Sequence, residues 1–244
     1  MKRLIYLSCL SVVLACCHRP AKIQHITGQL ILVDSAYDAI QDTNYMDALA
    51  PVKADLEAKL GAPIGYAPEA LEVHQPECTM LNWASDALLA MARQLCPEPV
   101  DMAVVNIGGM RCNWGAGDIT FRNVFELMPF DNELVVLTMK GKELLALCDV
   151  FAVSGGQGVA GLRMAAKHGV VTFATIADKE ILPEAYYTVA TSDYLSQGND
   201  GMLPLKNYIK YWNSEEKIRD LYIEYIKQVK VVQAKVDGRM DIQM

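Results

Sequence analysis

Short apolar segments of strand length and segments of helical periodicity follow one another along this chain without a strict strand–helix–strand alternation. That irregular order favours an α+β fold, with a mixed β-sheet and packed helices, over a doubly wound parallel sheet. The segments expected to form strands are residues 29–35, 64–67, 102–105, 134–139 and 186–191, a pair within 161–176 that turns near His168 and Gly169, and an edge strand over 238–243.

Five further segments carry helical signals. The expected helices cover residues 45–60, 78–95, 121–127, 142–153 and 214–235. The clearest is the second, in which apolar residues recur at helical spacing from Leu81 to Met91. We expect Thr79 to be the N-cap of this helix and Thr120 to be the N-cap of the third.

Length and composition allow a substantial core. The chain has 244 residues, of which 52% are hydrophobic, and a formal net charge of −7. The acidic balance argues against non-specific nucleic-acid binding, which needs a basic surface, but it permits a small anion in a locally basic pocket. No shift in composition marks a linker within residues 26–244, so we expect one domain there.

The N-terminus has the features of an export signal. Lys2 and Arg3 precede an apolar run over 4–15, which ends in alanine followed by Cys16. This pattern predicts a lipoprotein signal peptide and lipobox over residues 1–16, with Cys16 lipidated, and a tether over 17–25. The protein would then be an exported bacterial lipoprotein, membrane-anchored on the periplasmic side or at the cell surface. An ordinary signal peptide with incidental cysteines is the alternative.

The remaining cysteines are scattered and never spaced as Cys-x-x-Cys. They predict free, mostly buried thiols in place of a disulfide scaffold or a zinc site, although a single disulfide stays open.

A glycine-rich segment follows the expected strand over 102–105. It begins Asn106-Ile-Gly-Gly-Met-Arg111. Paired glycines let a backbone bend and approach a ligand closely. Asn106 offers a donor and an acceptor to a base or a ribose, and Arg111 offers a planar fork to phosphate or ribose oxygens. The alternative is a tight structural loop.

Two later segments place aromatic side chains beside polar ones. In Met-Pro-Phe-Asp-Asn, Phe130 is either a core residue or a rigid face for stacking a base. In the segment from Ser192 to Gly201, Tyr194 precedes Asp200 by six residues. A carboxylate suits the two hydroxyls of a ribose, but Asp200 is equally typical of a local turn cap.

The order and spacing of these motifs resemble the C-terminal, substrate-recognition domain of the 5′-nucleotidase family. The resemblance rests on NIGGMRCNWGAGDITFRNVFELMPFDNELVVLTMKGKELL, on VATSDYLSQGNDG, on ECTMLNWASDALL and on VDGRMDIQ. The family reads Asn-x-Gly-Gly-x-Arg, then Gly-x-Ile-Thr, Pro-Phe-x-Asn and Gly-x-x-Leu, and later an aromatic residue followed by Gly-Gly-Asp-Gly. The match covers about residues 40–244.

The resemblance implies roles for eight residues. Phe130 and Tyr194 would hold the base between them, and Asp200 would bind the ribose hydroxyls.

Asn106 and Arg111 would contact base, ribose or phosphate. Gly108 and Gly109 would shape their loop, and Asn132 belongs to the Pro-Phe-x-Asn motif among the substrate-binding residues.

The chain departs from the family pattern at several positions. Asn199 replaces the second glycine of Gly-Gly-Asp-Gly, where a residue tolerant of positive φ is needed. Asp131 stands where glycine is frequent and would add negative charge near the phosphate path. Gln75 and Pro76 occupy a region where the family often has an arginine, and Leu81 replaces a helix glycine. These departures predict weaker anion recognition.

No motif for catalysis or for metal binding accompanies the recognition signature. The four histidines, His18, His25, His74 and His168, show none of the spacings of a two-metal phosphatase site. Full-length family members carry that site on an N-terminal metallophosphatase domain. We expect no catalytic residue and no metal or other cofactor here, and the signal peptide is expected to join the recognition domain directly.

These observations favour a split 5′-nucleotidase. This chain would bind the nucleoside moiety of a nucleotide, and a separate metallophosphatase partner would supply divalent metals. A non-catalytic, lipid-anchored nucleoside- or nucleotide-binding protein is the alternative, and a degenerate structural domain is a third. An exposed apolar face beside the site is expected only where a partner docks.

Overall fold

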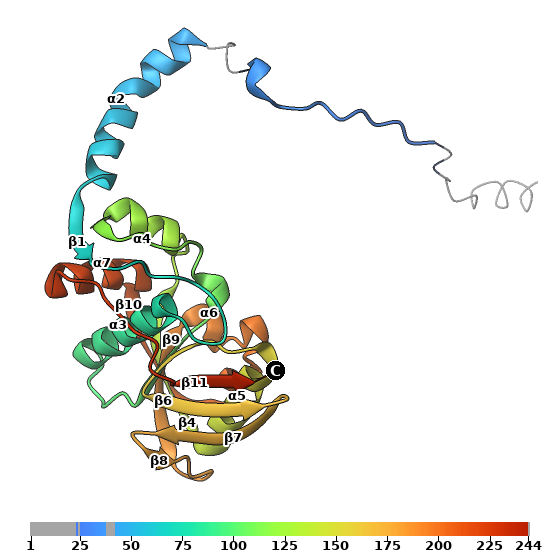
Figure 1. Cartoon of the computed structure of the whole chain (residues 1–244), viewed down its shortest axis with the longest axis vertical. Helices are drawn as coiled ribbons and strands as arrows, with labels where there is room; N and C mark the ends of the chain where they lie inside the picture. The colour runs from blue at the N-terminus through green and yellow to red at the C-terminus, as the bar shows by residue number, and fades with distance from the viewer. Residues whose placement is uncertain (1–22, 24, 38–41, 244) are drawn as a thin grey trace, which may run out of the picture. The chain divides into compact units, whose positions relative to one another are not determined.

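The computed structural model describes residues 23, 25–37 and 42–243 (Figure 1). The chain divides into two compact units, residues 1–50 and 51–244. The predicted signal peptide, the lipobox with Cys16 and most of the predicted tether lie outside the described residues. Lipidation and membrane anchoring therefore stay predictions.

The predicted strand over 29–35 is wrong. Residues 29–34 form no regular element, and Ser35–Tyr37 is a short 3-10 helix, η1. The apolar side chains of this stretch are exposed, including Leu30 and Val33 at 93% and 87%. An apolar run becomes a strand only where a neighbouring strand pairs with it and a core covers it, and within the described residues this run has neither.

The second unit is built around a five-stranded mixed sheet, which confirms the α+β prediction. Its strand order is β10-β4-β9-β2-β5. The strands are β2 (Met102–Val105), β4 (Glu133–Lys140), β5 (Gly158–Ala160), β9 (Tyr186–Ser192) and β10 (Tyr208–Lys217). Only the central β2–β9 pair is parallel, and the other neighbours are antiparallel.

A second sheet of four strands has the order β11-β6-β7-β8, and its buried side chains share a core with α5. It comprises β6 (Leu162–Lys167), β7 (Val170–Ile176), β8 (Lys179–Glu180) and β11 (Met240–Gln243). The predicted turn at His168 and Gly169 and the predicted edge strand at the C-terminus are both present. A separate two-stranded ribbon pairs β1 (Pro63–Ala67) with β3 (Gly117–Thr120).

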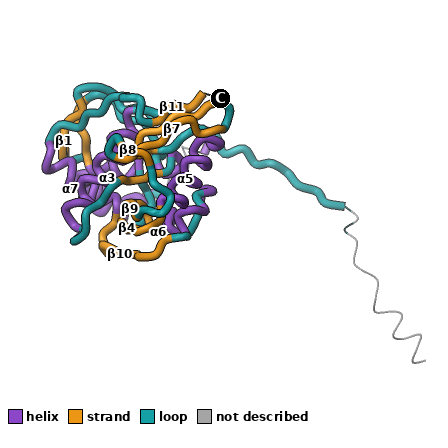
Figure 2. Tube along the Cα trace, turned by 90° about the horizontal axis from the view of Figure 1, so that it is seen from below, coloured by secondary structure: helices purple, strands orange, loops and turns teal. Residues whose placement is uncertain are grey.

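Helices cover both faces of the five-stranded sheet. They are α3 (Thr79–Leu95), α4 (Phe121–Leu127), α5 (Gly141–Ser154), α6 (Asp193–Ser196) and α7 (Ile218–Val229), and α2 (Thr43–Leu60) precedes them along the chain. Figure 2 shows α3 and α7 on one side of β4 and β9, and α5 on the other. No helix in the described part of the chain is long and apolar enough to cross a membrane.

Alternation along the central strand divides the interior into two cores. Ala103 and Val105 of β2 point into the core that contains α3 and α7. Met102 and Val104 point into the core that contains α5 and the four-stranded sheet. Because the strand is buried on both faces, its sequence reads as a continuous apolar run.

Four cysteines from Cys78 to Cys148 are free thiols, as predicted, and those two are buried.

The N-cap of α3 lies one residue before the predicted one. The Cys78 sulfur accepts a hydrogen bond from the Leu81 amide at 3.4 Å. The Thr79 hydroxyl instead accepts one from the Glu72 amide at 2.9 Å, which ties the preceding loop to the helix. The predicted cap at Thr120 is confirmed, with a reciprocal capping box to Asn123.

The predicted helix over 214–235 is wrong at both ends. Pairing with β4 extends β10 to Lys217, through an irregularity at which Glu215 has φ 61°. The helix α7 therefore starts at Ile218 and ends at Val229, before Lys230 takes φ 62°. Tertiary pairing overrides the helical spacing of residues 214–217.

Tyr222 on α7 supplies a stability test. Its side chain is fully buried, its ring lies 5.2 Å from that of Trp83, and its hydroxyl has no hydrogen-bond partner among the described residues. An unsatisfied buried polar group costs about 1–3 kcal/mol. Tyr222→Phe should therefore raise the free energy of unfolding by about 1 kcal/mol and Tm by about 2–4 °C in thermal denaturation.

Tyr187→Phe is the matched control. The Tyr187 hydroxyl oxygen accepts a hydrogen bond from the Leu182 amide at 3.0 Å, so this variant should lose stability. A lower Tm for Tyr222→Phe would show that its hydroxyl is satisfied.

Candidate functional site

The central strands meet at one edge of the five-stranded sheet. Because β2 and β9 are parallel, their carboxyl ends lie at the same edge, and the antiparallel β4 begins there. Loops that follow parallel strands at such an edge are the usual place for a ligand site. All eight predicted binding residues line a single cavity of about 300 Å³ at this edge: Asn106, Gly108, Gly109, Arg111, Phe130, Asn132, Tyr194 and Asp200.

Asp200 is the polar centre of the cavity. Its Oδ2 accepts a hydrogen bond from Asn106 Nδ2 at 2.5 Å, and its Oδ1 accepts one from the Tyr194 hydroxyl at 2.9 Å. The hydrogen bond to Asp200 raises the pKa of Tyr194. Each carboxylate oxygen thus already accepts one hydrogen bond from a side chain of the cavity lining, and a ligand hydroxyl would have to share that oxygen with it.

The turn that carries Asp200 has an unexpected backbone. Positive φ falls on Gly198, Asp200 and Gly201, with Asp200 at 53°, and not on Asn199. The reasoning that Asn199 is tolerated for its positive φ is therefore wrong. Its side chain donates to the Tyr194 carbonyl at 2.8 Å and fastens the turn to α6.

Gly109 permits the close approach of Asn106. A Cβ at position 109 would lie 2.8 Å from Asn106 Oδ1, closer than real contacts allow. At Gly108 a Cβ would lie 3.4 Å from Asp200 Oδ2. Neither glycine has positive φ, so the requirement at Gly109 is space for the Asn106 side chain, whereas a Cβ at Gly108 would make an ordinary contact.

Arg111 lies at the exposed side of the cavity. Its Nη1 donates to the Gly108 carbonyl at 3.1 Å, and its backbone amide donates to the Leu127 carbonyl at 2.8 Å. The remaining guanidinium donors are free to meet an anion.

Phe130 and Tyr194 present aromatic surface to the same cavity. Phe130 is 42% exposed and Tyr194 is 39% exposed, so neither is a core residue. The alternative reading of Phe130 as core is thereby wrong.

The Phe130 loop is held by two cations that sequence reasoning missed. Arg219 donates to the Phe130 carbonyl at 3.5 Å and to Asp131 Oδ1 at 2.6 Å, and its guanidinium lies 4.3 Å from the Phe125 ring centroid. Lys217 donates to Asp131 Oδ2 at 2.8 Å. These hydrogen bonds lower the pKa of Asp131.

The ion pairs correct the expectation that Asp131 adds free negative charge near the phosphate path. Its carboxylate is compensated by Arg219 and Lys217, and it does not line the cavity. The sequence did not indicate these two partners of Asp131, because both cations lie at the β10–α7 junction, which the sequence pattern predicted as helix.

Gln75 and Pro76 pack against the loop of Gly155 and Gly156, where a Cβ on Gly156 would lie 2.5 Å from the Pro76 carbonyl oxygen. Gln75 Nε2 donates to the carbonyls of Ser154 and Gly156, both at 2.8 Å. The adjacent Gln157 accepts a hydrogen bond from the Ile107 amide at 2.8 Å. Gln75, in the segment where an arginine was expected, thus holds the loop from Ser154 to Gly156, and the next residue, Gln157, holds the glycine-rich loop at Ile107.

Among the described residues, no group of three or more histidine, cysteine, aspartate or glutamate side chains is arranged to hold a metal ion.

Comparison with known proteins identifies the family. A family model described as the C-terminal domain of 5′-nucleotidase matches residues 63–207. Protein UshA of Escherichia coli is 30% identical over 167 residues, which are 66% of this chain and 30% of that protein. The 5′-nucleotidase of Vibrio cholerae is 26% identical over 194 residues, which are 78% of this chain and 35% of that protein.

A solved structure agrees. The 5′-nucleotidase precursor of Thermus thermophilus superposes with a TM-score of 0.73 at 27% identity, covering 83% of this chain and 44% of that one. The chain thus spans about a third of the length of the curated relatives and less than half of this structure. Since the model match covers more than half of the chain and the cavity residues fall in the family's order, the chain belongs to the 5′-nucleotidase family through its C-terminal domain.

Proposed function

We propose that this chain is the nucleoside-recognising component of a 5′-nucleotidase, and that a separate metallophosphatase supplies the metal site and cuts the phosphate ester. One observation carries the proposal. Side chains from three separate segments converge on one cavity that offers a carboxylate, two aromatic faces and a guanidinium. A nucleotide presents the complementary ribose diol, base and phosphate.

The distribution of charge in the cavity favours one orientation of a bound nucleotide. Asp200 is compatible with ribose hydroxyls but repels phosphate, whereas Arg111 is the cationic group that lines the cavity. The ribose would therefore lie against Asp200 and the phosphate toward Arg111.

Exposed apolar side chains near the cavity support docking of a partner. Leu203, which follows the turn of Asp200, is 64% exposed, and Phe125, beneath Arg219, is 39% exposed. A contiguous exposed apolar patch beside a site is typical of protein contacts, and these two side chains would form part of such a patch when a partner docks. Export and anchoring through Cys16 would place the assembly at a membrane surface.

Calorimetric titration with adenosine and AMP tests recognition. The wild-type chain should bind both, and Phe130→Ala with Tyr194→Ala should weaken binding by at least tenfold, because base stacking contributes about 1–3 kcal/mol per base. Phe173→Ala removes another half-exposed aromatic ring outside this cavity and should leave both affinities unchanged. Equal affinities in wild type and double variant would refute the assigned site.

The Tyr194 hydroxyl supplies a finer test, since it competes with ribose for Asp200 Oδ1. Tyr194→Phe keeps the aromatic face and should bind adenosine a few-fold more tightly, as expected for one hydrogen bond of about 0.5–1.5 kcal/mol. Affinity for 2′,3′-dideoxyadenosine should not change. Equal shifts for the two ligands would place the ribose elsewhere.

Activity measurements test the division of labour. The chain alone should release no phosphate from AMP with added divalent metals. Added to a lone metallophosphatase of the same organism, it should lower KM for AMP, and the double aromatic variant should not. Metal-dependent hydrolysis by the chain alone would overturn the proposal. Nucleoside binding without any gain in activity would favour the lipid-anchored binding protein.

A further inference from the structure

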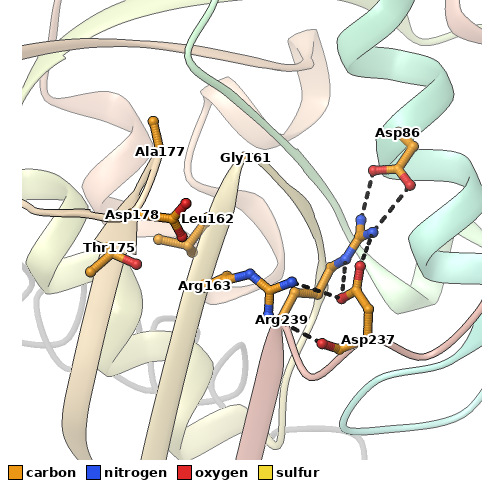
Figure 3. A pocket seen from close by; sticks show the side chains of 9 residues that line it. All are labelled: Asp86, Gly161, Leu162, Arg163, Thr175, Ala177, Asp178, Asp237 and Arg239. Carbon is orange, nitrogen blue, oxygen red and sulfur yellow. Dashed lines mark hydrogen bonds and ion pairs between the residues drawn. The ribbon is translucent and has the colours of Figure 1, made fainter.

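A second polar cavity, of about 240 Å³, lies at the end of the four-stranded sheet and shares no residue with the Asn106–Asp200 cavity (Figure 3). Its polar lining comprises Asp86 of α3, Arg163 of β6, Thr175 of β7, Asp178 of the β7–β8 turn, and Asp237 and Arg239 before β11. Arg163 and Thr175 are directly opposed partners on adjacent strands, so their side chains stand on the same face.

One wall of this cavity is a closed ion network. Arg239 donates from Nε and Nη2 to Asp237, at 3.0 and 2.8 Å, and from Nη1 and Nη2 to Asp86, at 2.6 and 3.2 Å. Its last N–H donates to the Val159 carbonyl at 3.0 Å. All five donors of the guanidinium are used, so this wall is rigid and has no donor left for a ligand.

The other groups in the cavity are not satisfied. Thr175 is only 6% exposed, and its hydroxyl has no partner within the described part of the chain. Asp178, in the turn on the same side of the cavity in Figure 3, also has no hydrogen-bond or ion-pair partner there. Arg163 makes one hydrogen bond, to the Asp237 carbonyl at 3.1 Å, and a long ion pair, to Asp237 Oδ1 at 4.0 Å, so several N–H donors of its 46% exposed side chain stay available.

These free groups define the chemistry of an occupant. Arg163 and the Thr175 hydroxyl offer donors to an anionic group, whereas Asp178 offers an acceptor to a cationic one. A buried hydroxyl without a partner costs free energy that a ligand acceptor would recover. The lining carries three carboxylates and two guanidinium groups, a net charge that disfavours phosphate. A volume below the roughly 300–1,000 Å³ of drug-sized sites indicates a small ligand.

We propose that this cavity binds a small zwitterion of the α-amino-acid class, with its carboxylate on Arg163 and the Thr175 hydroxyl and its ammonium group on Asp178. An adjoining cavity of about 620 Å³ shares Asp86, Asp237 and Arg239 and gives room for the ligand's side chain.

Titration calorimetry on the full chain tests the ligand class. L-alanine and L-glutamine should bind. L-lactate, which lacks the ammonium group, and L-alaninol, which lacks the carboxylate, should each bind about tenfold more weakly or not at all, because each loses one charged hydrogen-bonding contact. No binding of either amino acid, or binding of D-glucose in their place, would overturn the proposal.

Three variants test the assigned contacts. Arg163→Gln and Asp178→Asn should each weaken L-alanine binding about tenfold, and Thr175→Val, which keeps the shape of the side chain, a few-fold. Lys179→Gln, next to Asp178 but outside the lining, is the matched control and should bind as wild type. Unchanged affinity in both Arg163→Gln and Asp178→Asn would refute the site.

Adenosine titration of the same variants tests the amino-acid cavity separately from the proposed nucleoside site. Because the cavities share no residue, adenosine affinity should stay at the wild-type value in Asp178→Asn. Parallel loss of both ligands would show a general folding defect and would overturn the assignment of Asp178 as a ligand contact.

Discussion

Parallel pairing of β2 with β9 is the constraint on which both the cores and the candidate site depend. Met102 is paired with Val189 and Ala103 with Ala190 at the centre of the five-stranded sheet, with β4 and β5 on either side. These paired residues are apolar and buried on both faces, and the neighbouring polar side chain of β9, Thr191, is itself buried and donates its hydroxyl to the Val104 carbonyl at 3.0 Å. Polar side chains that a ligand can reach therefore lie where the strands end, and the parallel arrangement places Asn106 and the turn of Asp200 at one such end.

Two carboxylates near that edge show how environment separates their roles. Asp131 is compensated by Lys217 and Arg219 and restrains the loop of Phe130. Within the described residues, Asp200 accepts hydrogen bonds from the neutral donors Asn106 and Tyr194 and has no ion-pair partner, so its charge stays available at the cavity. A carboxylate held by neutral groups can still attract ligand hydroxyls, whereas one already paired with two cations has little further affinity for them.

Sequence reasoning located the cavity residues through the order and spacing of three motifs that resemble those of one family, since each motif alone also fits a structural loop. Asn106 and Tyr194 follow strands that the sequence shows as apolar runs, and the resemblance supplied their binding roles. Arg219 and Gln157 could not be found this way, since their roles come from contacts with residues distant in sequence, 88 and 50 positions away. The same limit explains β10, whose pairing with β4 overrode a helical spacing.

The C-terminal segment connects the second cavity to the core. Buried Glu77, just before α3, accepts hydrogen bonds from the Asp237 and Gly238 amides at 2.9 and 3.0 Å, and from Asn82 at 2.6 Å. These bonds fix the loop that carries Asp237 and Arg239, and β11 then pairs with β6 beside Arg163. The position of Asp237 and Arg239 in the cavity wall is therefore fixed by backbone hydrogen bonds to Glu77 just before α3. A ligand that bridges Arg163 and Asp178 would add a link between this wall and the β7–β8 turn, at the edge of a sheet where the two-residue strand β8 offers little pairing of its own.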